Sequence, residues 1–176
     1  MEIKKLEEII SLVDLDSPAL VEAVDSGVTL FELAENDHEK SCGQVLEAIK
    51  IAGKLEQKYC EADPERKTKL NPHKAMAVVV RAADESGVLA SYEEAMNNLF
   101  YSLEILCRSA DNAGVWLLIE NPKAGLMLSP LEMRDIIDNM SCPWVGVYFN
   151  KKNVAGVKVE DYQRILGKRI IAEYQP

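Results

Sequence analysis

The chain has 176 residues, of which 48% are hydrophobic and 28% are charged, and its formal net charge is −9. This length fits one domain, and this composition excludes a wholly disordered chain and a collagen-like or coiled-coil rod. The acidic balance argues against a nucleic-acid partner, which needs a basic surface, and the apolar runs are too short to span a membrane.

The N-terminal part of the sequence predicts three helices and one further segment that fits either a strand or a helix. Apolar residues recur at helical spacing over residues 3–13, and residues 17–27 predict a second helix that ends at the glycine. Residues 28–34 alternate and favour a strand, with a helix as the alternative. A third helix begins at Gly43. The charged residues 61–74 include two prolines and predict an exposed loop.

From residue 75 onward, continuous apolar strands alternate with amphipathic helices. Strands of this kind are typical of a parallel sheet that is buried on both faces. Both an open doubly wound sheet and part of a (β/α)8 barrel fit this order, and no glycine-rich phosphate-binding motif follows any strand. The predicted strands cover residues 75–82, 115–120, 144–150 and 169–174, and the predicted helices cover residues 91–114, 129–140 and 159–167.

The four cysteines are too far apart in the sequence for a CxxC metal or redox motif. Cys107 lies in an apolar run, and we expect it to be a small core residue. Free thiols are typical of cytosolic proteins, and no apolar stretch follows the charged start as it does in a signal peptide. The sequence therefore predicts a cytoplasmic location.

Three segments, AGVWLLIENP, LSPLEMRDIIDNMSCPWVGVYFN and VEDYQRILGKRI, occur in this order in the C-terminal half. They resemble the xylose isomerase-like TIM barrels of the sugar phosphate isomerase/epimerase family, and the resemblance covers residues 75–171. It implies an α/β fold in which a partial (β/α) TIM-barrel-like parallel sheet of about five strands has flanking helices, within a single domain of residues 1–176. It also implies isomerisation or epimerisation next to a carbonyl, with a divalent metal at the carboxyl ends of the strands.

The same resemblance places a site at the ends of two strands. Glu120 is followed by Asn121 and Pro122 and matches the family's first metal-binding glutamate. Asn150 stands where the family has a metal-binding aspartate, and an amide oxygen can coordinate a cation without adding charge. The residues implied for the metal are Glu120 and Asn150, and those implied for the substrate are Asn121, Asn153, Lys151 and Lys152.

Departures from the family pattern predict that the metal site is degraded. Asn150 replaces the aspartate, Tyr174 stands near the position of the family's histidine, and the family's last metal-binding glutamate has no counterpart. Lys151 and Lys152 would also oppose a bound cation. No catalytic residue is therefore assigned. A divalent metal is expected as a family trait, and the sequence leaves open whether this chain has kept it or lost it.

Three functions remain open at this point. The favoured one is a sugar phosphate isomerase/epimerase-like protein, not catalytic as a single chain, that binds a sugar, a sugar phosphate or another metabolite. The alternatives are an active metal-dependent enzyme completed by oligomerisation, and a structural or regulatory interaction protein. Five strands are fewer than the eight of a closed barrel, so we expect a truncated barrel. Its sheet either opens and flattens, is covered by the N-terminal helix, or is covered by homodimerisation, which we favour.

Overall fold

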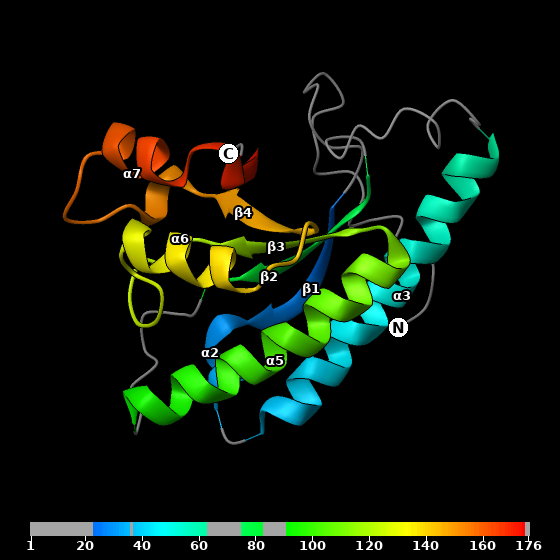
Figure 1. Cartoon of the computed structure of the whole chain (residues 1–176), viewed down its shortest axis with the longest axis horizontal. Helices are drawn as coiled ribbons and strands as arrows, with labels where there is room; N and C mark the ends of the chain where they lie inside the picture. Colours follow the sequence, from blue (N-terminus) through cyan, green and yellow to red (C-terminus); the bar gives the residue numbers. More distant parts are fainter. Residues whose placement is uncertain (1–22, 36, 63–74, 83–90, 175–176) are drawn as a thin grey trace.

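The structure is a computed structural model that describes residues 23–35, 37–62, 75–82 and 91–174. Five parallel strands form one sheet in the order β1-β2-β3-β4-β5 (Figure 1). The strands are β1 (Ala23–Thr29), β2 (Ala77–Arg81), β3 (Trp116–Glu120), β4 (Val145–Phe149) and β5 (Ile170–Glu173). The helices are α2 (Leu30–Ala34), α3 (His38–Ala62), α5 (Tyr92–Ala113), α6 (Pro130–Asn139) and α7 (Val159–Leu166), with 3-10 turns η3 (Lys151–Asn153) and η4 (Gly167–Arg169).

The order of the strands in the sheet follows their order in the chain. A (β/α) barrel has this arrangement, whereas a doubly wound sheet reverses its order at a switch point. The prediction of a partial (β/α) TIM-barrel-like parallel sheet with flanking helices is therefore confirmed. The helix expected over residues 3–13 and all but the first two residues of the loop expected over 61–74 lie outside the described residues.

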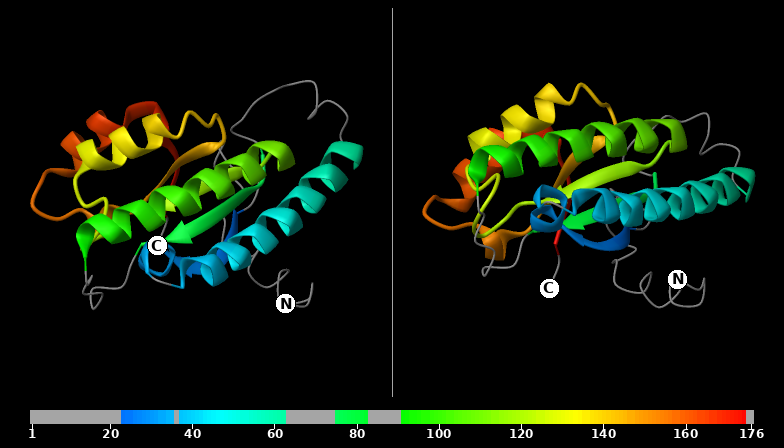
Figure 2. Two further views of the ribbon diagram at one scale, coloured as in Figure 1. Left: turned by 60° about the horizontal axis from the view of Figure 1, so that its bottom comes forward. Right: turned by 90° about the horizontal axis from the view of Figure 1, so that it is seen from below.

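The two faces of the sheet carry different layers of side chains. On one face, strand residues join the helices in the main core, and α3 and α5 lie side by side over it (Figure 2). On the other face, a smaller cluster receives no side chain from any described helix. We call this second face the inner face, because it corresponds to the interior of a barrel. Its buried residues are Ala75, Ala77, Val79, Trp116, Leu118 and Ile171.

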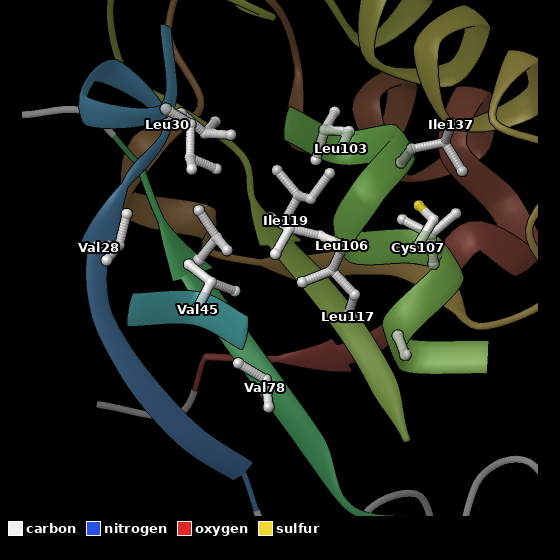
Figure 3. Close-up of a cluster of buried hydrophobic side chains, with 14 of the residues drawn as sticks. Val28, Leu30, Val45, Val78, Leu103, Leu106, Cys107, Leu117, Ile119 and Ile137 are labelled. Atoms are coloured by element: carbon white, nitrogen blue, oxygen red, sulfur yellow. The ribbon is translucent and has the colours of Figure 1, made fainter. Parts of the chain in front are cut away.

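Helix α5 supplies the middle of the main core. Three of its leucines, Leu99, Leu103 and Leu106, are fully buried. Figure 3 shows two of them in one cluster with Leu117 and Ile119 of β3. The helix ends at Gly114, whose φ of 64° is in the left-handed region that favours glycine. The long predicted helix and the strand after it are thus confirmed.

The predictions for residues 17–34 are wrong over most of the described part. Strand β1 occupies Ala23–Thr29, although a helix was expected through residue 27, and α2 occupies Leu30–Ala34, where a strand was favoured and a helix was the alternative. The Thr29 side chain accepts a hydrogen bond from the backbone N–H of Glu32, whose carboxylate accepts one from the Thr29 N–H. This capping box begins a helix within an alternating segment. Gly27, with φ 69°, lies where the register of β1 against β2 shifts rather than at a helix end.

Gly146 of β4 tests how closely the inner face is packed. A Cβ there would overlap the Ile171 side chain and lie 3.1 Å from the carbonyl oxygen of Arg169. We expect Gly146→Ala to lower the free energy of unfolding by about 1–3 kcal/mol, because the backbone of the neighbouring segment cannot yield freely. Gly43→Ala is the control, since it adds a methyl group to open space in α3 and raises stability by about 1 kcal/mol. Urea denaturation of both variants measures the difference, and a Gly146→Ala protein as stable as the original would contradict the close packing.

Candidate functional site

Polar side chains gather where β3 and β4 end. Glu120 is the last residue of β3 and lies opposite Tyr148 of β4 in the sheet register. Asn150 directly follows β4, and Asn153 closes the turn η3. The carboxyl ends of parallel strands meet at one edge of the sheet, so residues about 30 positions apart in the sequence come into contact.

The Glu120 carboxylate accepts hydrogen bonds from three N–H groups. Its Oε1 atom accepts from the side-chain amide of Asn150 at 2.7 Å and from that of Asn153 at 3.1 Å. Its Oε2 atom accepts from the backbone N–H of Ala82, after β2, at 3.3 Å. The ends of β2 and β4 therefore supply three donors to a carboxylate at the end of β3, and these bonds satisfy its charge without any cation.

Backbone groups determine which way the two amides face. Asn150 Oδ1 accepts a hydrogen bond from the backbone N–H of Lys152 at 3.0 Å, so its nitrogen faces Glu120. The Asn153 Nδ2 atom, which donates to Glu120, also donates to the carbonyl oxygen of Asn121 at 2.8 Å. A backbone N–H only donates and a carbonyl only accepts, so turning the Asn150 amide over would break a bond at each of its ends, and turning the Asn153 amide over would break both bonds that its Nδ2 donates.

Asn121 joins the two strand ends to each other. Its Oδ1 accepts from the backbone N–H of Asn150 at 2.6 Å, and its Nδ2 donates to the Asn150 carbonyl oxygen at 3.1 Å. The Asn121 side chain is fully buried. It therefore holds β4 in place beside Glu120, and its predicted contact with substrate stays a prediction.

The two predicted lysines reach toward the end of β5 rather than toward Glu120. Lys151 forms an ion pair with Glu173 at 2.9 Å, and the Lys152 ammonium lies 5.3 Å from the centre of the Tyr174 ring. Glu173 also accepts a hydrogen bond from Gln163 of α7 at 2.9 Å. The structure thus brings Glu120, Asn150 and Asn153 together and places the lysine ammonium groups beside β5.

Arg81 and Tyr148 also belong to this edge of the sheet and were not singled out from the sequence. Arg81 ends β2 and forms an ion pair with Asp25 of β1. The pKa of Tyr148 is raised by burial first, and then by the negative charge of Glu120. A charged residue after the buried run MAVVV was a usable signal for Arg81, whereas Tyr148 could be found only from its register opposite Glu120.

The donor set at this edge does not fit a divalent metal ion. Hard cations take several oxygen ligands, mostly carboxylates. Here the groups that face the Glu120 carboxylate are amide nitrogens, which repel a cation. In the part of the chain that the structure describes, no three or more histidine, cysteine, aspartate or glutamate side chains are grouped to hold a metal.

Asn121→Asp tests the connection between the strand ends. The change removes the N–H that the Asn150 carbonyl accepts and buries a carboxyl group. We expect a loss of about 3 kcal/mol in unfolding free energy at pH 8. Burial raises the pKa of such a carboxyl in the folded state, so the loss is smaller at pH 5, where the group is protonated. Urea denaturation at both pH values measures the free energy of unfolding. The control is Asn97→Asp, a change at an exposed position of α5. Equal losses of stability in the two variants would contradict the connecting role of Asn121.

The comparisons with known proteins give matches among solved structures. No protein-family model matches the sequence, and no curated protein matches it. A D-tagatose 3-epimerase-like protein has a TM-score of 0.63 and 18% identity. The 3-keto-D-glucoside 4-epimerase of E. coli has a TM-score of 0.60 and 11% identity, and a xylose isomerase domain protein of Planctomyces limnophilus has 0.58 and 15%.

These alignments cover most of this chain and only part of each neighbour. They include 99%, 80% and 83% of this chain, and 62%, 53% and 44% of the three solved structures in the same order. The chain therefore spans about half the length of the structures that it matches. Among the described helices, none has the length and apolar character needed to cross a membrane. The resemblance seen in the sequence is confirmed at the level of the fold: this chain has the fold of the xylose isomerase-like TIM barrels.

Proposed function

We propose that this chain is a sugar isomerase/epimerase-like protein that binds a sugar or another polyhydroxylated metabolite and does not carry out metal-dependent catalysis by itself. One observation carries the proposal: amide N–H groups occupy the carboxylate of Glu120, at the strand end where the family resemblance implies a metal ligand. The fold supports the ligand class, because its solved neighbours include an epimerase and an epimerase-like protein.

Metal-dependent isomerisation requires free carboxylate oxygens, because the cation must reach them to stabilise the enediolate. To release Glu120 here, the amides of Asn150 and Asn153 would have to turn away. Each amide is also held by a backbone partner, so turning costs two hydrogen bonds for each side chain. The Glu120 carboxylate is accordingly arranged as an acceptor for N–H and O–H donors rather than as a metal ligand.

The same edge offers groups that suit a hydroxyl-rich ligand. The Tyr148 hydroxyl and the Glu120 carboxylate lie on neighbouring strands and can donate to and accept from sugar hydroxyls. Arg81 adds a cation, and its partner Asp25 adds an acceptor. Tyr148 and Tyr174 stand edge to face, with ring centres 6.5 Å apart, and present apolar surface beside these polar groups.

We further propose that two copies of the chain associate. Among the described strands, β1 and β5 each have only one neighbour, and unpaired edges of parallel strands favour pairing with another chain. A symmetric pair would also cover part of the inner face. Light scattering coupled to size-exclusion chromatography tests this directly, and a mass of one chain at micromolar concentration would exclude it.

Asn150→Asp tests whether the Asn150 amide occupies the Glu120 carboxylate in place of a metal ion. The change places a second carboxylate against Glu120, and like charges repel. We therefore expect the free energy of unfolding to fall by about 2 kcal/mol in the absence of metal. A divalent ion should then restore the melting temperature, because a carboxylate pair suits hard cations. Melting scans with Mg²⁺ or Mn²⁺, and with EDTA, measure both effects.

The matched control is the double variant Asn150→Asp with Glu120→Gln. It returns the site to a single carboxylate, so its stability should recover in part and should not respond to metal. The unsubstituted chain should also show no shift with metal and no bound metal on elemental analysis. A stoichiometric metal in the unsubstituted chain, with loss of that metal in Glu120→Gln, would favour the alternative of an enzyme completed by a partner chain.

Ligand binding is tested by melting scans with D-fructose, D-tagatose and their phosphate esters. A sugar present at 100 times its dissociation constant stabilises the folded chain by about 2.7 kcal/mol, a shift of several degrees. We expect Tyr148→Phe to reduce this shift, and Tyr101→Phe, an exposed tyrosine of α5, to leave it unchanged. If neither the sugars nor their phosphates shift the melting temperature, the interaction-protein alternative replaces sugar binding.

A further inference from the structure

Two cysteines that are 35 positions apart in the sequence lie together in the fold. Cys107 belongs to α5, and Cys142 lies in the segment between α6 and β4. The Cys142 thiol donates to the carbonyl oxygen of Cys107 at 3.5 Å, and the two side chains are close enough for each thiol to change the pKa of the other. Both are free cysteines in the structure.

The two thiols differ in their access to solvent. Cys107 is 4% exposed and belongs to the same buried cluster as Ile137 of α6 (Figure 3). Cys142 is half-buried, and the residues on either side of it, Ser141 and Pro143, are exposed. A small solute can therefore reach Cys142 while Cys107 lies directly behind it.

The surroundings also give the two thiols different acidities. A hydrogen bond from Cys107, with a further one from the backbone of Trp144, lowers the pKa of Cys142 to about 7. Burial opposes this shift, as does the negative charge of Asp111. The pKa of Cys107 is raised, because its hydrogen bond to Cys142 and its burial both favour the neutral thiol. Cys142 is thus the nucleophile at neutral pH, and Cys107 keeps its proton.

We propose that Cys142 and Cys107 form a redox-modification site that hydrogen peroxide, or another small hydroperoxide, converts to an intramolecular disulfide. The Cys142 thiolate attacks one oxygen of the peroxide and becomes a sulfenic acid, while hydroxide leaves. The Cys107 sulfur then attacks the Cys142 sulfur, and the sulfenic oxygen leaves as water with the Cys107 proton. The sum is two thiols and one peroxide giving one disulfide and two waters, and a reducing dithiol reverses it by thiol–disulfide exchange.

This bond would connect the main core to the strand that carries the candidate site. Cys142 precedes β4, which carries Tyr148 and leads to Asn150. The disulfide would close a loop that contains β3 and α6, and such a closure stabilises the folded state by restricting the unfolded chain. For a chain of this size we expect the melting temperature to rise by roughly 5–10 °C on oxidation.

The experiment treats the full reduced chain with hydrogen peroxide and counts thiols before and after. We expect two of the four thiols to disappear, a mass decrease of about 2 Da for two hydrogen atoms, and a peptide that links Cys107 to Cys142. Dithiothreitol should restore all four thiols. Retention of four thiols, a disulfide between two chains, or sulfinic acid at Cys142 in the unsubstituted chain would overturn the proposal.

Single variants separate the two roles. Cys142→Ser should react slowly with peroxide and form no disulfide. Cys107→Ala should accumulate a sulfenic acid at Cys142 that dimedone traps, and the loss of its hydrogen bond should raise the pH at which Cys142 alkylation is half-maximal above about 7. Cys42→Ser, a buried cysteine of α3, is the matched control and should behave like the unsubstituted chain. An unchanged alkylation profile in Cys107→Ala would show that the two thiols are not coupled.

Discussion

The candidate site depends on one buried amide. Asn121 holds the backbone of Asn150 by both of its hydrogen-bonding atoms, and it does so in a place without solvent. Water cannot replace either bond there, so the end of β4 is held at one position beside β3. Glu120, the residue before Asn121, then meets the amide of Asn150 at 2.7 Å. The contacts that Asn150 and Asn153 make with Glu120 follow from this connection between neighbouring strand ends.

Amide donors and a metal ion satisfy a carboxylate in different ways. A metal needs a carboxylate-rich shell, and it can polarise a sugar carbonyl. Amide N–H groups satisfy the charge and hold the carboxylate still, yet they supply no Lewis acid. The arrangement around Glu120 is of the second kind, which is why the proposed function is ligand binding on the fold of an isomerase. The same fold supports many activities, so the local chemistry carries more weight than the architecture.

The main core and the inner face contain different kinds of side chain. The main core is closed by α2, α3, α5, α6 and α7, whose buried residues are almost all aliphatic or aromatic. The inner face has aromatic residues such as Trp116 and Trp144, whose rings meet edge to face, together with the polar groups at the strand ends. Between β4 and α5, the Cys107–Cys142 pair adds reactive groups to an otherwise apolar layer. Apart from Cys107, which lies within α5, the reactive side chains are at strand ends and in the segments between elements, where the backbone leaves room for them.

Much of the fold was predictable from residues 75–174, because continuous apolar strands and amphipathic helices there agree with local propensities. Residues 30–34 of the alternating segment form a helix instead of the favoured strand, since the Thr29–Glu32 capping box outweighed their strand-like pattern. Glu120, Asn150 and Asn153 were identified by resemblance, because each stands at or just after a strand end. The direction of their amides, the register of Tyr148 and the meeting of Cys107 with Cys142 were not predictable. Those features depend on distances between residues about 30 to 35 positions apart, and only the packing of the helices and strands brings such residues into contact.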